Sequence, residues 1–421
     1  MRTATYVPNK RNVQGTTTSI FQPDLLIPMT IFSAVGGSRR RLDCRLVFAI
    51  VIAILLPCYC TGYPSLQRDS CFAALYAFGD SYTDTGNFVR AIYPSSPIGR
   101  PPYGETFFRR PTGRASDGRL VVDFLAEAVG LPLLPPYLAE LSTAAAEVWR
   151  RGACFAVGWS AAMDAAFFRE LGLKNLSWTG LSLAAQLQLF QDLQHSLTPE
   201  PGYRDMMSNS LFLVGEFGVN DYQYFLFLAK NVTDVYSAIP NVTSTISMGI
   251  KDLIRLGART LIVPGVFPLG CLPNLLTLFK SERNEDYEPR TGCLKFLNEL
   301  STRHNLRLQE ELDRLRELHP EVAIIYADYY GAATEIFNFP KKFGFKTPLT
   351  ACCGGGKGPY NYSPLVNCGD KGSKVCDDPS QYVSWDGIHL TEAASEIVAR
   401  GVLEGLYAVP SVAETCSSFS M

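Results

Sequence analysis

Short apolar runs alternate with longer helical patterns along most of this chain. Helical patterns fill the intervals, and residues 297–315 carry leucines on one face and charges on the other. Strands that alternate with helices predict an α/β fold, with a parallel sheet between two layers of helices. Glycine, proline or polar residues bound five runs that predict buried strands, at 74–78, 154–157, 211–214, 260–263 and 322–326.

The same pattern defines the domain boundaries. A helix is predicted over 117–129, before Gly130, and a last helix from Thr391 to about Tyr407. A length of 421 residues allows one or two domains. Without an internal repeat or a low-complexity linker, we expect a single domain over 68–410 and a C-terminal tail over 411–421.

The N-terminal extension over 1–62 carries a targeting pattern. Arginines 39–41 precede the uncharged apolar run 46–56, which is typical of a signal peptide and predicts secretion. The run is shorter than the roughly 20 residues of a spanning helix. The alternative is an uncleaved signal anchor that holds the protein at a membrane. Because the run begins far from residue 1, Met29 is an alternative start.

Cysteines and glycosylation triplets agree with an extracellular destination. Twelve cysteines are present, none with zinc-site spacing, so we expect disulfides and no metal. Spacing does not fix the connectivity. We expect Cys271 to pair with Cys293, and the four late cysteines to pair among themselves (Cys352, Cys353, Cys368 and Cys376). Four acceptor triplets begin at Asn175, Asn231, Asn241 and Asn361.

A candidate nucleophile follows the first predicted strand. Gly79-Asp80-Ser81 places a serine where the strand leaves the sheet, and its backbone N–H can face a developing oxyanion. Alone, this tripeptide is a weak signal, because it is more typical of an ordinary turn. A net charge of −2 gives no reason to expect a nucleic-acid partner.

A candidate base lies near the other end of the chain. Asp386 precedes His389 by three residues, a spacing that lets the carboxylate reach the imidazole Nδ1 and leave Nε2 for the serine proton. The other histidines have simpler interpretations: His195 is expected in solvent, His304 in helix packing and His319 at a helix end. Asn220, after the third strand, is a candidate amide donor to the oxyanion; the competing interpretation is a polar turn.

Taken together, these residues resemble those of the plant-type secreted GDSL esterase/lipases of the SGNH hydrolase family. The similarity extends from Ala73 to about Tyr407. The motifs that carry it are Phe78-Gly-Asp-Ser-Tyr-Thr-Asp-Thr-Gly-Asn87, Arg100-Pro-Pro-Tyr-Gly104, Gly113-Arg-Ala-Ser-Asp-Gly-Arg119, Gly215-Glu-Phe-Gly-Val-Asn-Asp-Tyr222, Val263-Pro-Gly265 with Pro268-Leu-Gly-Cys271, Tyr326-Ala-Asp-Tyr-Tyr330 and Trp385-Asp-Gly-Ile-His-Leu-Thr-Glu-Ala393.

The resemblance implies a flavodoxin-like sheet of five parallel strands and neither metal nor cofactor. It also implies that Ser81 is the nucleophile and that Asp386 and His389 complete a triad. The implied oxyanion donors are the Ser81 N–H, a glycine N–H assigned here to Gly158, and Asn220.

One block departs from the family pattern. Relatives usually carry asparagine at the position of Cys154 and a second glycine at that of Trp159. The family's oxyanion glycine aligns either with Gly158 or with Trp159. In the second case a bulky side chain crowds the acyl pocket, and losing one such donor typically reduces the rate about a hundred- to a thousand-fold.

The expected function is hydrolysis of carboxylic esters through an acyl-enzyme. The resemblance suggests small acyl groups, such as acetyl, on a cell-wall polysaccharide or a secondary metabolite. The expected partner is therefore a small-molecule or polysaccharide ester, with no stable membrane partner unless the leader stays uncleaved. Two alternatives remain open: an impaired relative that binds glycans or esters, and an acyltransferase that uses the same acyl-enzyme.

Overall fold

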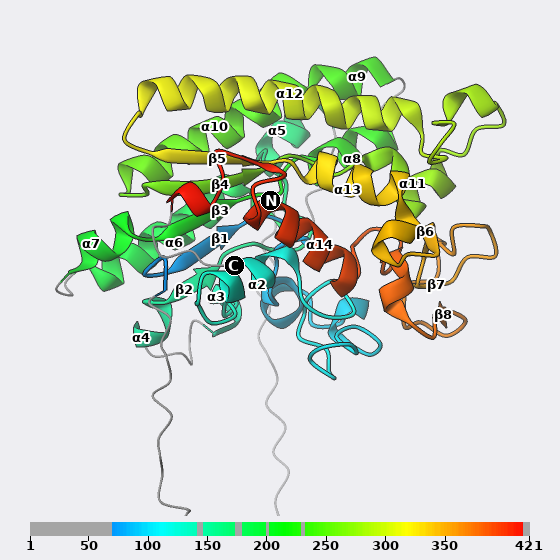
Figure 1. Ribbon diagram of the computed structural model, residues 1–421, viewed down its shortest axis with the longest axis horizontal. Helices are drawn as coiled ribbons and strands as arrows, with labels where there is room; N and C mark the ends of the chain where they lie inside the picture. The colour runs from blue at the N-terminus through cyan, green and yellow to red at the C-terminus, as the bar shows by residue number, and fades with distance from the viewer. Residues whose placement is uncertain (1–69, 141–145, 173–178, 199–201, 229–231, 416–421) are drawn as a thin grey trace, which may run out of the picture. The chain divides into compact units, whose positions relative to one another are not determined.

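The central sheet of the computed structural model has six strands, in the order β10-β5-β4-β3-β1-β2 (Figure 1). The structure describes residues 70–140, 146–172, 179–198, 202–228 and 232–415. The strands are β1 (Leu75–Phe78), β2 (Gly152–Cys154), β3 (Leu211–Val214), β4 (Thr260–Pro264), β5 (Ala323–Ala327) and β10 (Ala408–Val409).

Strands β1 to β5 run parallel, in the order 2-1-3-4-5 that defines a flavodoxin-like sheet. The predicted parallel five-stranded core is therefore confirmed. The sixth strand, β10, pairs antiparallel with β5 at one edge and was not predicted. It spans two residues, too short a run for alternation to be recognised.

Helices cover both faces of the sheet, as the alternating pattern predicts. One face carries α6 (Leu183–Leu197), α10 (Ile239–Arg255) and α12 (Lys295–Leu318). The other carries α2 (Val121–Ala128) and α14 (Glu392–Leu403), with α13 (Tyr329–Asn338) against α14 (Figure 1). The other α-helices of the described ranges are α3 (Tyr137–Glu140), α4 (Ala146–Trp149), α5 (Ala165–Glu170), α7 (Tyr203–Ser208), α8 (Val219–Leu228), α9 (Val232–Ser237) and α11 (Pro273–Leu278).

Aromatic side chains fill the space between the sheet and α6. Phe190 of α6 lies 5.2 Å from Tyr76, 5.6 Å from Phe155 and 5.7 Å from Phe212, measured between ring centroids. All four side chains are buried, and aromatic pairs at this spacing add to the free energy gained from burial. This packing fixes β1, and with it the turn that follows β1.

Two predicted elements have different bounds in the structure. Strand β2 was expected over 154–157, but it covers Gly152–Cys154. Beyond it, the N–H groups of Phe155 and Val157 still donate to the carbonyl oxygens of Ala77 and Gly79. Helix α2 was expected from 117 but begins at Val121. The Asp117 carboxylate instead accepts hydrogen bonds from Thr106 and from the backbone of Glu392, so the segment before α2 serves a long-range contact.

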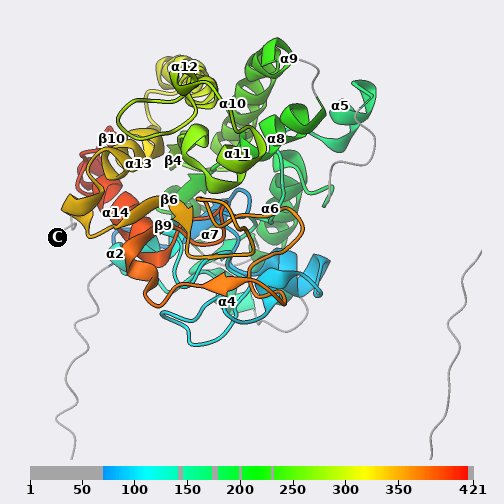
Figure 2. The same ribbon diagram turned by 90° about the vertical axis from the view of Figure 1, so that its right-hand side faces the viewer.

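Two small sheets lie at the carboxyl edge of the central sheet, the side that faces the viewer in Figure 2. Strand β6 (Thr347–Ala351) pairs with β9 (Tyr382–Ser384), and β7 (Cys353–Gly354) pairs with β8 (Lys374–Val375). The expected Cys271–Cys293 disulfide is present. The four late cysteines pair among themselves, as Cys352–Cys376 and Cys353–Cys368. The two late bridges hold the segment beside β9, and the turn that carries His389 follows β9 directly.

The predicted leader over 46–56 lies outside the described residues. Among the helices that the structure describes, none has the length and apolar character needed to cross a bilayer. Of the four glycosylation triplets, those at Asn175 and Asn231 also lie outside the described residues. Asn241 is exposed on α10, whereas Asn361 is half-buried and its amide donates to the Ala351 carbonyl at 3.0 Å.

Candidate active site

Ser81 lies in the turn directly after β1, at the carboxyl edge of the sheet. Gly79 makes this turn possible: its φ is +154°, and a Cβ there would lie 2.6 Å from the Gly215 carbonyl oxygen. Gln186 of α6 holds the same glycine through both its backbone N–H and its carbonyl, at 2.9 and 2.8 Å. Asp80 then accepts the Tyr82 N–H at 3.0 Å. The serine is therefore presented by a fixed turn.

His389 and Asp386 lie between β9 and α14 and meet Ser81 across the edge of the sheet. The His389 Nε2 is 2.8 Å from the Ser81 Oγ, and its Nδ1 is 2.8 Å from the Asp386 Oδ2. Their turn is closed by a hydrogen bond from the Trp385 N–H to the His389 carbonyl, at 2.8 Å. The structure thus brings Ser81 to Asp386 and His389, although Ser81 and His389 lie 308 positions apart in the chain.

The Asp386 carboxylate is buried and receives four hydrogen bonds. Its Oδ1 accepts the backbone N–H groups of Ile388 and His389, and its Oδ2 accepts the Tyr103 hydroxyl at 2.8 Å as well as the imidazole. Burial alone would raise the pKa of Asp386, but His389 and these donors hold it below its usual value. The carboxylate therefore stays ionised and fixes the imidazole tautomer.

Tyr103 was not singled out by the sequence analysis. It lies in the Arg100-Pro-Pro-Tyr-Gly104 motif, far from Asp386 in the chain, and its ring lies 5.9 Å from that of Trp385. Burial, and then the charge of Asp386, raises the pKa of Tyr103 well above its usual range, so its hydroxyl remains a donor. In the sequence, the only sign of a role for Tyr103 is its place within that motif.

The other three histidines lie where the sequence predicts. His195 is exposed, and His319 is half-buried at the end of α12, with its Nδ1 3.8 Å from Glu321. His304 is fully buried in α12, and its Nδ1 lies 2.6 Å from the Tyr222 hydroxyl. Burial lowers the pKa of His304 to about 3, so the ring is neutral and serves packing.

Gly158 is wrong as an oxyanion donor. Its backbone N–H donates to the Asp84 Oδ2 at 2.8 Å. The same carboxylate accepts the N–H groups of Gly86, Asn87 and Phe88, so Asp84 ties the Gly158 backbone to the segment after Ser81. An N–H committed to a buried carboxylate cannot also stabilise an oxyanion in the Ser81 pocket.

Trp159, the next residue, lines the Ser81 pocket. Its φ of +67° lies in the left-handed region that favours glycine. The Tyr224 hydroxyl donates to its carbonyl at 3.0 Å. The expectation that this side chain crowds the pocket agrees with its place in the wall, beside Phe88 and Ile98.

Asn220, at the start of α8, lines the same pocket but is already hydrogen bonded. Its Nδ2 lies 2.9 Å from the Asp80 Oδ2 and 2.9 Å from the Ser160 carbonyl oxygen. Both amide protons have acceptors, so Asn220 reaches an oxyanion only by releasing one of them. The Ser81 N–H, by contrast, makes no hydrogen bond with the part of the chain that the structure describes.

Buried carboxyl groups lie beneath the Ser81 turn. Burial raises the pKa of Asp80 to about 7 and that of Asp221 to about 6, although backbone N–H groups oppose both shifts. Glu216 is fully buried, and its pKa is raised well above the usual range by burial and by the charges of Asp80 and Asp221. Neither Glu216 oxygen has a hydrogen-bond partner among the described residues.

The pocket over Ser81 has a volume of about 280 Å³. Its wall combines aromatic and aliphatic side chains with a few polar groups; the residues besides Ser81, Trp159, Asn220 and the triad partners are Phe88, Tyr93, Ser96, Pro97, Ile98, Tyr103, Gln223, Asn367 and Ile388. Within the described ranges, no group of three histidine, cysteine or acidic side chains is placed to hold a metal ion.

Comparison with known proteins identifies the family. A model described as GDSL-like lipase/acylhydrolase matches residues 75–402. The chain belongs to this family. A GDSL esterase/lipase of Arabidopsis thaliana is 44% identical to the hydrolase over 379 residues, which are 89% of this chain and 94% of that protein. The sinapine esterase of Brassica napus is 42% identical over 362 residues, which cover 84% and 90%.

Among solved structures, an α/β hydrolase enzyme from the metagenome of Lake Arreo, Spain, aligns over 80% of this chain and 96% of its own. The TM-score is 0.31 and the identity 14%. The family match places the hydrolase among the carboxylic ester hydrolases.

Proposed function

We propose that this hydrolase cleaves carboxylic esters with Ser81 as nucleophile, His389 as general base and Asp386 as the group that orients it. The observation that carries the proposal is the chain of two 2.8 Å contacts from Ser81 through His389 to Asp386. A hydroxyl, an imidazole and a buried ionised carboxylate in this order make up a nucleophile, a base and an orienting acid.

The chemistry follows from these contacts. His389 Nε2 takes the Ser81 proton while Oγ attacks the ester carbonyl, and then returns it to the alcohol as the ester C–O bond breaks. Water, deprotonated by the same nitrogen, next attacks the acyl-Ser81 carbonyl. The C–O bond to Oγ breaks, the acid leaves, and the proton returns to Ser81.

The oxyanion is stabilised first by the Ser81 N–H. Asn220 supplies a second donor when its amide releases the Ser160 carbonyl, since its other proton can stay on Asp80. The amide then donates to the charged oxyanion in place of the uncharged Ser160 carbonyl oxygen, so the exchange is favoured in the transition state. A donor available only after rearrangement makes the hydrolase slower than one with a preformed site.

The substrate we propose is an ester of a small acyl group, such as acetyl, on a polysaccharide or small-molecule alcohol. The pocket volume of about 280 Å³ lies near the lower limit of small-molecule sites. Trp159 occupies part of the wall where a glycine would leave space. The sinapine esterase relative is named for a different substrate, so the acyl preference needs a direct test.

We also propose that the hydrolase is secreted as one catalytic domain, after removal of a leader within residues 1–62. The disulfides between described residues, Cys271–Cys293, Cys352–Cys376 and Cys353–Cys368, support an oxidising compartment, because such bridges are rare in the cytosol. Exposure of Asn241 agrees with a glycosylated surface.

The test is turnover of p-nitrophenyl acetate, butyrate and octanoate by wild type and by Ser81→Ala. We expect the acetate ester to be cleaved fastest, and Ser81→Ala to lose about a thousand-fold or more. Ser208→Ala is the matched control, since Ser208 is exposed on α7. Equal turnover by wild type and Ser81→Ala would refute the proposed nucleophile, and preferred octanoate turnover would refute the small acyl group.

A further inference from the structure

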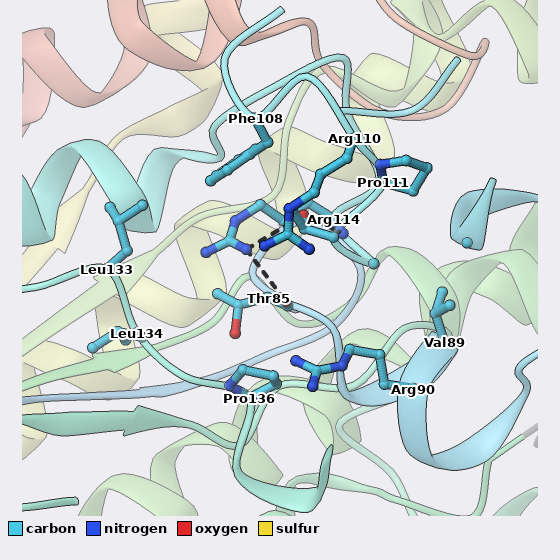
Figure 3. A pocket seen from close by; sticks show the side chains of 13 residues that line it. Thr85, Val89, Arg90, Phe108, Arg110, Pro111, Arg114, Leu133, Leu134 and Pro136 are labelled. Carbon is cyan, nitrogen blue, oxygen red and sulfur yellow. Dashed lines mark hydrogen bonds between the residues drawn. The ribbon is translucent and has the colours of Figure 1, made fainter. Parts of the chain in front are cut away.

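Figure 3 shows a second cavity, which has a volume of about 530 Å³. The two spaces share no lining residue. Val89 and Gly99 face this cavity, whereas their neighbours Phe88 and Ile98 face Ser81. It is therefore a separate concave site, and its volume falls within the range of small-molecule sites.

Three arginines and no acidic residue line this cavity: Arg90, Arg110 and Arg114. Arg114 is buried, and its guanidinium binds both oxygens of Asp123, at 2.8 and 2.7 Å. That ion pair compensates the charge of Arg114. The side chain of Arg110 also enters the cavity (Figure 3), so the lining carries a further positive charge beside that ion pair.

Among the lining residues, Arg110 is the strongest indication that the cavity binds a ligand. Its guanidinium makes no hydrogen bond or ion pair with the described residues, although it reaches over a concave surface. An arginine presents planar donors that match a carboxylate in a bidentate geometry. Arg110 is exposed, as arginines commonly are on protein surfaces, but here it lines a concave surface whose other walls are largely apolar.

Apolar side chains form the remaining walls of the cavity. Phe108, Pro111, Leu133, Leu134 and Pro136 all line it. The Phe108 ring is held in place by the Arg114 guanidinium, whose carbon lies 4.8 Å from the ring centroid. A ligand that satisfies both parts of the lining combines one anionic group with a flat apolar body.

We propose that this cavity binds a small carboxylate that carries an apolar ring, with Arg110 bound to the carboxylate and the ring lying against Phe108 and the proline and leucine walls. The site is distinct from the Ser81 pocket, and binding requires no turnover. The proposal therefore does not rest on the ester hydrolysis proposed above.

The test is isothermal titration of the full-length secreted protein with benzoate at low ionic strength, beside benzamide as the uncharged isostere and inorganic phosphate as an anion without a ring. The same titrations are made with Arg110→Gln and with Arg109→Gln. Arg109 is the matched control: it is an exposed neighbour outside the lining, and its guanidinium donates to the Glu105 carbonyl at 3.2 Å.

We expect benzoate to bind wild type and Arg109→Gln with the same affinity, and Arg110→Gln about tenfold or more weakly. Benzamide and phosphate should bind more weakly than benzoate. Leu133→Asp adds a negative charge to the half-buried apolar wall and should also weaken the binding of benzoate. It tests the same cavity through a second residue, so the conclusion does not depend on the folding of Arg110→Gln alone. No benzoate binding, equal binding by wild type and Arg110→Gln, or binding of benzamide or phosphate as tight as benzoate would overturn the proposal.

Discussion

The hydroxyl of Tyr103 holds the Asp386 carboxylate, and Tyr103→Phe tests this role with little other change. The substitution keeps the buried ring against Trp385 and removes only the donor that lies 2.8 Å from the Asp386 Oδ2. Asp386 retains three donors, from the backbone of Ile388 and from the backbone and imidazole of His389. No cavity is created, so the effect reports one hydrogen bond.

A hydrogen bond to a charged group contributes about 1.5–3 kcal/mol, and we expect Tyr103→Phe to lower the free energy of unfolding by that amount at neutral pH. The pKa of Asp386 is held below its usual 3.8 in the folded protein. Its stabilisation is therefore present above that value and is lost as the pH falls through the folded pKa. The difference between wild type and variant should shrink in the same range.

The assay is urea unfolding at about pH 7 and at about pH 2, well below the usual aspartate pKa, because the folded pKa of Asp386 is itself lowered. Tyr82→Phe is the control, since the Tyr82 hydroxyl donates to the uncharged Ile388 carbonyl at 2.7 Å. That variant should lose about 0.5–1.5 kcal/mol at both pH values. If Tyr103→Phe matched wild type at neutral pH, or lost as much at both pH values, the carboxylate would not be held by this hydroxyl.

Three further substitutions test other parts of the site. Burial raises the pKa of Glu216, so the wild-type protein should lose free energy of unfolding as the pH rises from about 5 to 8 and this carboxyl group is driven to ionise. Glu216→Gln removes the ionisable group and should make that loss smaller. Identical pH profiles of wild type and variant in denaturant titrations would contradict this. Trp159→Gly should widen the pocket and raise p-nitrophenyl butyrate turnover relative to acetate, an idea that fails if the ratio is unchanged. Asp386→Asn should lower kcat for acetate by about 10⁴-fold at neutral pH, by analogy with other serine triads; a loss below about tenfold would show that Asp386 does not orient the base.

The sequence was sufficient to predict the parallel core and the meeting of Ser81, Asp386 and His389 at its edge. Strands β1, β3, β4 and β5 are runs of mostly buried residues with clear boundaries, and the carboxyl ends of parallel strands share one edge of the sheet. Ser81 and Asn220 follow two of these ends. Asp386 and His389 are separated by three positions, a local spacing that sequence displays directly.

Other features of the site depend on contacts between distant segments. The Tyr103 hydroxyl reaches Asp386 across 283 positions, and no local pattern indicates such a pairing. The error at Gly158 has the same origin, because its N–H is taken by Asp84, 74 positions earlier. The β10 strand gains its identity from pairing with β5 and not from its own two residues. Local spacing identified the groups present, and tertiary packing decided which donors remained available.

The central claim is that Ser81 becomes acylated with the help of His389. Labelling by a fluorophosphonate probe, followed by mass spectrometry of the peptides, tests this most directly, because the probe forms a stable bond only with an activated serine. We predict one adduct, on Ser81, that is absent in Ser81→Ala, strongly slowed in His389→Ala and unchanged in Ser208→Ala. An adduct on another residue, or labelling of Ser81 at the same rate without His389, would contradict the account.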